Sequence, residues 1–588
     1  MYRLLSILLY LVACFFFVPS SSIAAVLQGN PSNYTTLLRQ LKPGDTLKLA
    51  GGTYTKDLNV QNIRGNAKAW ITITGPTSGK PATFLARSCC NTVELKNVSY
   101  IAIRHLTLDG KAGKSAFGVS AKGGSANKVH HIRVENNKII NYNSGQQTVG
   151  ISTKTPTWGW EIRGNTILRA GTGMYLGNSN GKEPFFDAII EHNVIMHTTG
   201  YNMQIKHQWK RDNIPGMPTQ PTKVILRHNV FIKDNRPSPS GARPNVLIGG
   251  FPPSGLGAKD MTEIYGNLFY YNSNESLLQA TGRVTIHDNV FVGSKTGYAI
   301  RLQKHNINLG FALVFQNTMY SMRRGIYVGS KATEKLSIIG NLIFAQQRMG
   351  GQITGAKDNL DLPLAQAPSY VLKPSTQLGA MDFYPKQGKC EGSPLQIPNM
   401  PASGRVDFNG TPKGSALRFR GAYSGHSKNP GWKLSAAMKQ LTKTPPKEPA
   451  PQEPSPQEPT PQEQITPPEP PSKEVTPDAG VPTQDAPLQD SVQIEAPGQE
   501  PAGQEPQTTP DNSKEPDSAS FPDNTSNDTG GISDKEPPGD AKATTGCGCN
   551  SAHRGEFSFG LIFFLLGLSL MIWRSFWGNH DLGKSGSI

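Results

Sequence analysis

Long helical periodicity is absent from this chain. No stretch between Val26 and Ser435 repeats its apolar residues every three to four positions. That absence argues against a helical bundle and against alternating strand–helix units. The sequence also has no nucleic-acid-binding motif, and its six cysteines in 588 residues match no zinc spacing. We therefore expect short strands throughout the body of the protein.

A short pattern recurs where helices are missing: an aliphatic residue, two variable residues, Asn, one residue, then an apolar one. Its eight asparagines lie 28, 28, 36, 38, 22, 28 and 24 residues apart. A fixed unit with a variable insert is typical of a solenoid. The asparagines are Asn137, Asn165, Asn193, Asn229, Asn267, Asn289, Asn317 and Asn341.

Each repeat also holds alternating apolar runs that indicate strands, and a unit this short has no room for a strand–helix–strand crossover. The sequence thus predicts an all-β fold: a single-stranded right-handed parallel β-helix of about ten turns, here called rungs. Rungs spaced ~4.8 Å apart give a rod of about 45–50 Å. We expect the asparagines at bends, where a left-handed residue is often needed, with their amides stacked from rung to rung.

The opening of the body resembles a known family. Leu41–Leu47 and Gly51–Tyr54 look like an entry rung, and Ile103–Gly110 looks like an early rung with Leu106 at the asparagine position. With the repeats, these segments resemble the pectate-lyase-like β-helix superfamily over residues 26–360, and within it the chondroitinase B and alginate lyase family. The resemblance implies the fold and an activity on uronate polysaccharides.

Composition divides the chain into five parts. Residues 1–25 read as a secretory signal peptide, 26–359 as the β-helix and 360–445 as a C-terminal arm or cap over the last rung. Residues 446–546, rich in Pro, Glu and Gln, read as a disordered spacer. Residues 547–588 carry a membrane anchor.

The last part holds Cys547-Gly548-Cys549 and then 17 mostly apolar residues, 557–573, enough for a transmembrane helix. This order resembles the myxobacterial C-terminal sorting signal, which implies processing and surface display; a plain membrane anchor is the alternative. Either way we expect a secreted protein anchored at the cell surface or membrane of a Gram-negative bacterium.

Three cysteines, Cys89, Cys90 and Cys390, lie in the exported body, where disulfides persist. Two arrangements are open. One is a vicinal bridge, and the other is a link from Cys89 or Cys90 to Cys390.

Charge favours an acidic partner. The chain has a net charge of +16, but the spacer holds 20 acidic against 5 basic residues, so residues 26–445 carry +29. A body that basic attracts polyanions, and an acidic polysaccharide fits best in the absence of a nucleic-acid motif. The charge could instead serve solubility or pair with the spacer. We expect a monomer that does not bind nucleic acid.

The second apolar run of each repeat has outward positions that should stack into one stripe. The stripe mixes rings, amides and cations, as expected of a groove for a sugar chain. Its members are Ser152, Lys154, Tyr175, Gly177, Gln204, Lys206, Leu247, Gly249, Leu278, Ala280, Arg301, Gln303, Tyr327 and Gly329.

Two long inserts, 208–221 with Trp209 and 233–259, bracket Gln204, Lys206 and His207, so the cleft should centre there. We expect the substrate to be bound by Lys154, Tyr175, Gln204, Trp209, Gln303 and Tyr327.

If the protein is a lyase, the reaction is β-elimination from a uronate, with Lys206 as base and His207 in reserve. Arg301 or Lys154 would brace the carboxylate, or Ca²⁺ would do so in their place. The resembled family pairs a Lys with an Arg from the next rung, but that rung here reads Leu247-Ile248-Gly249. Its acidic calcium ligands are not clearly matched either.

Two alternatives stay open. A non-catalytic adhesin or envelope glycan-binding protein would use the same cationic surface. A glycoside hydrolase needs two carboxylates on one face. The stripe holds none, which leaves Asp187, Glu191 and Asp212 as its candidates.

Overall fold

The computed structural model describes residues 24–88, 90–111 and 116–441. Most of the predicted signal peptide, the spacer and the predicted membrane anchor lie outside these residues. Among the residues described, no helix is long and apolar enough to cross a membrane.

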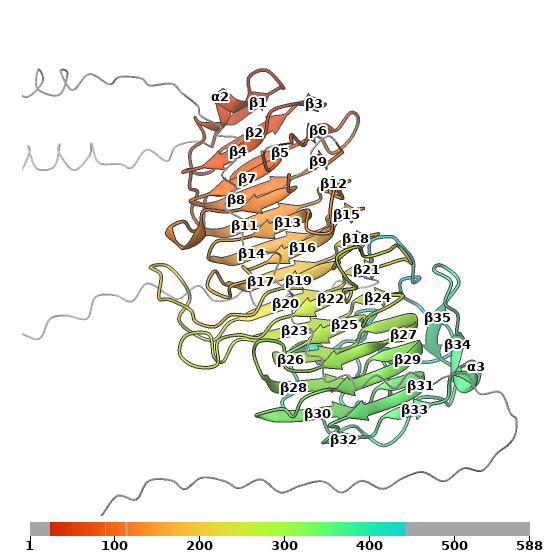
Figure 1. The fold of residues 1–588 in the computed structure, drawn as a ribbon. Coiled ribbons are helices and arrows are strands. Elements are labelled where there is room, and N and C mark those ends of the chain that lie inside the picture. Colours follow the sequence, from red (N-terminus) through yellow and green to blue (C-terminus); the bar gives the residue numbers. More distant parts are fainter. Residues whose placement is uncertain (1–23, 89, 112–115, 442–588) are drawn as a thin grey trace, which may run out of the picture. The chain divides into compact units, whose positions relative to one another are not determined.

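The body is a parallel β-helix with three faces, as predicted (Figure 1). Parallel strands joined by crossovers wind right-handed in nearly all proteins, and this coil fits that hand. The first face holds thirteen strands: β1 (Val26–Gly29), β2 (Thr46–Leu49), β5 (Ile71–Thr74), β8 (Val98–Arg104), β11 (Val129–Glu135), β14 (Thr157–Arg163), β17 (Phe185–Glu191), β20 (Lys223–Arg227), β23 (Met261–Tyr265), β26 (Gly282–His287), β28 (Leu309–Phe315), β30 (Lys335–Ile339) and β32 (Ala356–Lys357).

The other two faces merge into one sheet because three long strands run through both. The second face is β3 (Gly52–Tyr54), β6 (Ala82–Leu85), β9 (Leu106–Asp109), β12 (Lys138–Ile140), β15 (Thr166–Leu168), β18 (Val194–Met196), β21 (Val230–Ile232), β24 (Leu268–Tyr270), the first parts of β27 (Val290–Leu302), β29 (Thr318–Val328) and β31 (Leu342–Gly351), and β33 (Leu360–Leu362). The third face is β4 (Leu58–Gln61), β7 (Val93–Lys96), β10 (Val119–Ala121), β13 (Val149–Thr153), β16 (Thr172–Leu176), β19 (Met203–Ile205), β22 (Val246–Ile248), β25 (Leu278–Ala280) and the last parts of β27, β29 and β31.

Inward side chains stack along the coil and form its core. Phe231, Phe269 and Phe291 are fully buried, and their ring centroids lie 5.2 Å and 4.7 Å apart in stacked geometry. Alternation along each strand places such residues inside and their neighbours outside. The coil therefore presents a regular outer surface on which residues far apart in sequence become neighbours.

The asparagine ladder is confirmed. Each buried amide donates from Nδ2 to Oδ1 of the next, as from Asn193 to Asn229 at 2.9 Å and from Asn229 to Asn267 at 3.0 Å. Asn359 extends the ladder by one member, and Leu106 takes the equivalent place before Asn137, whose Oδ1 accepts from the Leu106 amide at 3.0 Å. The ladder thus satisfies buried backbone groups at one corner of the coil.

The left-handed residue at this corner is the one before each ladder asparagine, and not the asparagine itself as expected. Its φ lies between 48° and 66° in every rung. Small or polar residues tolerate this conformation, so the column is rich in Gly, Asn, Asp and His. We call it the left-handed column: His105, Asn136, Gly164, His192, His228, Gly266, Asp288, Gln316, Gly340 and Asp358.

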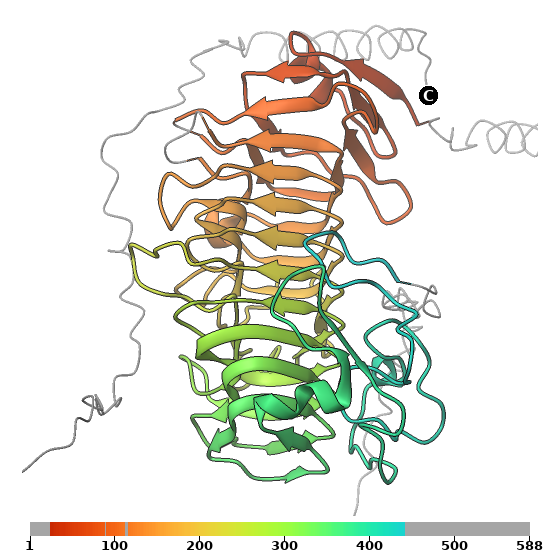
Figure 2. The same ribbon diagram turned by 90° about the vertical axis from the view of Figure 1, so that its right-hand side faces the viewer.

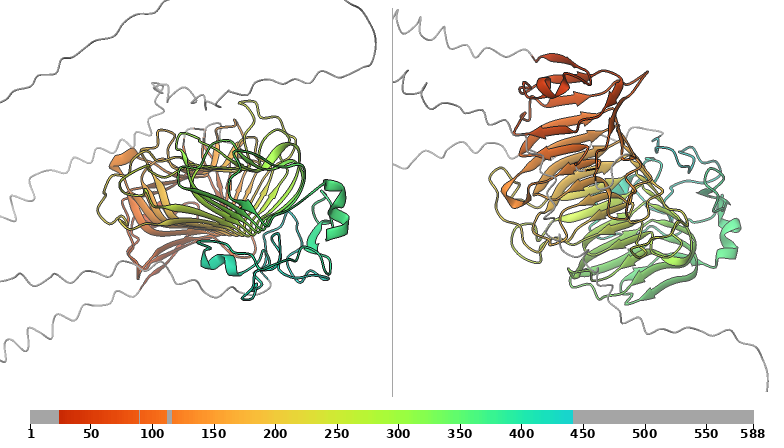
Figure 3. Two further views of the ribbon diagram at one scale, coloured as in Figure 1. Left: turned by 90° about the horizontal axis from the view of Figure 1, so that it is seen from below. Right: turned by 45° about the horizontal axis from the view of Figure 1, so that its top comes forward.

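The arm after β33 packs along the side of the coil, a wider contact than the predicted cap over the last rung (Figures 2 and 3). Coil strands continue to Leu362, three residues past the expected boundary. Apolar arm residues such as Phe383, Phe408 and Tyr423 cover second-face residues such as Leu268. The short helices and arm strands are α2 (Tyr34–Leu38), η1 (Gly124–Ala126), η2 (Leu364–Gln366), α3 (Ala367–Tyr370), η3 (Ala402–Arg405) and the antiparallel pair β34 (Val371–Lys373) and β35 (Asp382–Pro385).

The proposed link between the arm and the early rungs through Cys390 is not formed. Cys390 is a free and buried thiol, and burial raises its pKa to about 12. Cys90 takes part in a disulfide.

Candidate functional site

The structure confirms an outward stripe of aligned residues on the third face. Strand register aligns Tyr175 with Gln204, Gln204 with Leu247, and Arg301 with Tyr327. One step of the prediction is wrong: Leu278 and Ala280 are core residues with no exposure, and Gln279 lies in the stripe between Leu247 and Arg301. Strand β22 is apolar at all three positions, and two apolar residues, Leu277 and Leu278, precede Gln279 in β25, so alternation has no clear phase here.

A second column runs two residues further along each strand. Backbone hydrogen bonds continue the pairing past the strand ends, from Lys206 to Leu176 and from Gly249 to Ile205, both at 2.8 Å. Lys154, Gly177, Lys206, Gly249, Thr281, Gln303 and Gly329 thus lie in one line. A Cβ on Gly249 would come within 2.3 Å of the His207 amide nitrogen, so this position needs Gly.

Lys206 and His207 follow β19 at the edge where the third face meets the first. Both are little exposed, at 7% and 6%. The Lys206 Nζ is 5.7 Å from the centroid of the Tyr175 ring. The His207 ring meets Trp209 edge-on at 5.2 Å, and its Nδ1 is 3.1 Å from Asn306 Nδ2.

The stripe is unevenly open. Gln204, Leu247 and Gln279 are 5% exposed or less, so the expected centre of the cleft is largely covered. Tyr175 and Lys154 on one side of it, and Arg301, Gln303 and Tyr327 on the other, are half-buried. Trp209 is 49% exposed. The accessible residues therefore flank the predicted centre.

The inserts lie on both edges of the third face, because one joins β19 to β20 and the other runs from β21 through β22 to β23. The first is pinned by a buried ion pair between Arg211 and Asp260 at 2.8 Å, and the Arg211 guanidinium lies 3.6 Å from the Phe186 ring centroid. These contacts hold Trp209 at the rim.

Arg301 lies several rungs away from Lys206. Register separates Arg301 from Gln204 by three strand steps, about 14 Å. Lys154 is two steps from Lys206, about 10 Å. The positions next to Lys206 in its own column are Gly177 and Gly249, so neither neighbouring rung supplies a cation there.

The hydrolase candidates do not form a pair on the third face. Glu191 and Asp187 are on β17 of the first face, and Asp212 is in the first insert. Glu191 pairs with Arg227 at 2.6 Å and with Arg163 at 3.0 Å. Burial, with a smaller contribution from Asp260, raises the pKa of Asp187 to about 6.

The described residues also offer no cluster of acidic side chains for a calcium ion. In the part of the chain that the structure describes, no group of three or more His, Cys, Asp or Glu side chains could hold a metal ion. We therefore derive no step through a cation.

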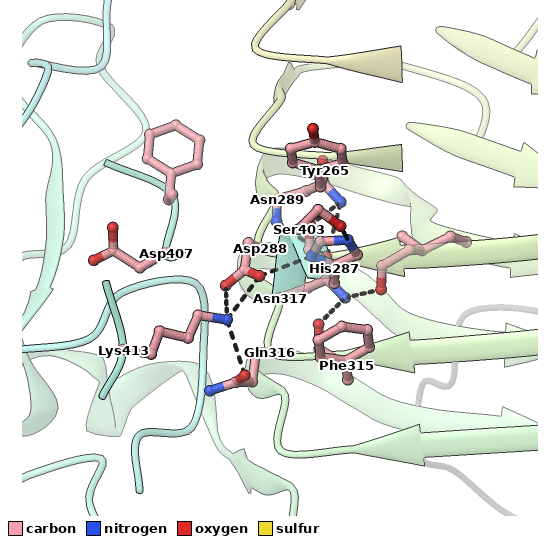
Figure 4. Close-up of polar contacts among 12 residues, drawn as sticks. Tyr265, His287, Asp288, Asn289, Phe315, Gln316, Asn317, Ser403, Asp407 and Lys413 are labelled. Carbon is pink, nitrogen blue, oxygen red and sulfur yellow. Dashed lines mark hydrogen bonds and ion pairs between the residues drawn. The ribbon is translucent and has the colours of Figure 1, made fainter. Parts of the chain in front are cut away.

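A second polar cluster, buried under the arm, was not foreseen (Figure 4). Ser403 Oγ is 3.1 Å from His287 Nε2, and His287 Nδ1 is 2.8 Å from Asp288 Oδ2. The order resembles a hydrolase triad. However, all three residues are at most 8% exposed, and Ser403 donates its hydroxyl hydrogen to Glu263.

This cluster anchors the arm to the coil. Lys413 Nζ lies 2.7 Å from Asp288 Oδ1 and donates to Gln316 Oε1 at 2.9 Å, so it bonds two members of the left-handed column. Burial opposes the charge on Glu263, but hydrogen bonding and attraction from His287, together with Lys223, lower its pKa to about 2. Ser403 and His287 are 116 residues apart, so no local motif could have revealed this contact.

The arm grips the same column again near its end. Lys439 Nζ donates to the Gly266 carbonyl at 2.6 Å and lies 3.4 Å from His228 Nδ1. Burial lowers the pKa of both Lys439 and His228 well below their ordinary values. The two groups can therefore lie together without a full repulsion between charges.

Comparisons with known proteins found similarity to solved structures alone. No family model and no curated protein matches the chain. Solved structures that it resembles include the PL6 family alginate lyase AlyGC, at 15% identity and a TM-score of 0.39, covering 58% of this chain and 51% of that one. The chain thus spans about half the length of that lyase.

Two further structures are similar. Pectate lyase Pel9A is 10% identical, with a TM-score of 0.37, and covers 72% of this chain and 98% of its own. The GH136 lacto-N-biosidase from Eubacterium ramulus is 9% identical, with a TM-score of 0.31, and covers 57% and 68%. Identities this low transfer no activity to the chain.

Proposed function

We propose that this protein binds an acidic polysaccharide along the outer side of the third face. The observation that carries the proposal is the stripe itself, in which Tyr175, Arg301 and Tyr327 share one line of aligned residues. Rings can stack on sugar faces, and cations can pair with carboxylates. The net charge of +29 on residues 26–445 would draw such a polymer from solution.

The proposal predicts a local effect of losing the accessible residues beside the covered centre. In the full chain, Lys154→Gln combined with Tyr175→Ala should weaken binding to immobilised alginate, chondroitin or pectin about tenfold, because a cation and a stacking ring are both lost. Retention should also fall with added salt. The elution salt and the dissociation constant measure both effects.

Lys48→Gln is the matched control, because Lys48 is exposed on β2 of the first face. It removes the same charge and should leave binding nearly unchanged. Equal losses in both variants would mean that attraction is spread over the whole body, and the third-face proposal would fall.

Elimination is the second candidate, because Lys206 lies in the outward line with its Nζ 5.7 Å from the Tyr175 ring centroid. In that reaction the C5–H bond breaks and its proton passes to neutral Lys206. A C4–C5 double bond forms, and the C4–O bond to the next sugar breaks as that oxygen takes a proton from water. The low exposure of Lys206 favours binding without cleavage. Ultraviolet absorbance of the unsaturated uronate that Lys206→Met abolishes would instead establish a lyase.

The same proposal includes export by residues 1–25 and anchoring by residues 547–588, so that the coil meets its polymer outside the cell. Protease added to intact cells should then remove the coil. Recovery of intact protein from the cytoplasm would contradict this part.

A further inference from the structure

Four side chains of β27 and β29 form a compact group at the far end of the stripe, here called the Arg–Tyr cluster: Tyr298, Arg301, Arg324 and Tyr327. The tyrosine ring centroids are 4.9 Å apart. The Tyr298 ring lies 5.4 Å from the Arg301 guanidinium carbon and 5.0 Å from that of Arg324. All four are half-buried, so part of each faces solvent.

The cluster carries positive charge without a counter-ion. Several other arginines of the coil pair with carboxylates, as Arg133 does with Glu161 at 3.1 Å. Among the residues that the structure describes, no carboxylate lies within ion-pair distance of Arg301 or Arg324. Two guanidinium groups beside one ring repel each other unless an anion joins them.

Hydrogen bonds orient the cluster, but several N–H donors of its arginines have no acceptor among the described residues. Arg324 donates to the Tyr298 hydroxyl and to Gln347 Oε1, which fixes its plane. In the described part of the chain, the buried Nε of Arg301 has no acceptor. A guanidinium has five N–H donors, so most of those on the two arginines are free for a ligand with several oxygens.

We infer that the Arg–Tyr cluster binds one anionic sugar unit, with the sugar ring on the tyrosines and its carboxylate or sulfate ester on the arginines. Paired N–H groups of Arg suit planar or branched oxyanions, and aromatic faces suit sugar rings and cations. The inference rests on the proposed function and specifies its ligand.

Position makes the cluster an anchoring subsite. Arg301 is about 14 Å from the Gln204 position, and Tyr298 and Arg324 precede it toward the opposite edge of the third face from Lys206. Only an oligosaccharide of several units could reach both places. The cluster should therefore add more affinity for chains long enough to reach both places than for shorter ones.

Calorimetry on the full chain tests this. The double variant Arg301→Gln, Arg324→Gln should bind a uronate octasaccharide at least tenfold more weakly, since charge-assisted hydrogen bonds are lost. The same tenfold difference should appear when the two arginines are replaced in a protein that already lacks Lys154 and Tyr175. Arg323→Gln is the control, because Arg323 is exposed and adjacent in sequence. Repeating the titration with a sulfated octasaccharide shows which anion the site prefers.

A second measurement is independent of polymer binding and of variant folding. In the parent protein with 15N-labelled arginine, sodium glucuronate or sodium sulfate should shift the Nε–H signals of Arg301 and Arg324 but not that of Arg323. Shifted signals without polymer binding would remove the proposed function and keep the anion site. Unmoved signals, or octasaccharide binding unchanged in the double variant, would overturn the site.

Discussion

Replacing Asn229 with Ala is expected to lower the free energy of unfolding by about 3–5 kcal/mol, because several buried polar groups lose their partners at once. The Asn229 amide donates to the Ile190 and Arg227 carbonyls at 2.8 and 2.9 Å and to Asn267. Its oxygen accepts from both the backbone and the side chain of Asn193. Asn229 has no exposure, so the groups left over cannot turn to bulk solvent.

Urea unfolding followed by circular dichroism measures the change. Asn359→Ala is the graded control. Asn359 ends the ladder, is partly exposed and, within the described part of the chain, bonds only to Ile338 and Asn341. Its loss should be about 1 kcal/mol. If the Asn229 variant lost no more than the Asn359 variant, the ladder would not be a main support of the coil.

Lys413→Met should have a similar effect through the arm. The substitution leaves Asp288 charged, buried and without its cation, which costs about 3–5 kcal/mol in comparable pairs. Both side chains are 1% exposed, and Lys413 also bonds Gln316. We expect the arm to become sensitive to limited proteolysis, with lower stability toward urea, while the coil retains its β-sheet signal.

Two comparisons make this result interpretable. Adding Asp288→Asn to Lys413→Met removes the stranded charge and should recover much of the loss, since Asn tolerates the left-handed backbone at this position. Lys210→Met breaks an exposed pair with Asp212 and should change nothing measurable. Equal losses in the single and double variants would show that the charge is not the cause.

The fold could be predicted from the sequence because an asparagine recurs at the same position in successive rungs. The asparagine spacing revealed the winding of the middle rungs, and Leu106 was placed at the ladder position without an amide to mark it. The first face has thirteen strands where about ten rungs were expected, because the earliest rungs carry no ladder asparagine. Strand alternation then brought Tyr175, Gln204 and Arg301 into one column, as the register shows. Local rules were enough wherever neighbouring rungs repeat the same chemistry.

The predictions from sequence were wrong where strand alternation allows two orientations, and incomplete where no local pattern marks a contact. Leu277 and Leu278 are adjacent apolar residues before Gln279, so the alternation has two possible phases there and the prediction took the wrong one. The burial of Gln204 and Lys206 depends on tertiary packing that their own strand does not encode. The arm contacts of Lys413 and Ser403 join residues more than a hundred positions apart and leave no pattern.

Hydrogen exchange of the full chain with and without an acidic octasaccharide tests the central claim most directly. Binding along the stripe should slow exchange in the third-face segments around Tyr175 and β27 to β29. The first face around β2 to β8 should be unchanged. Protection confined to the first or second face, or none at saturating ligand, would contradict the account.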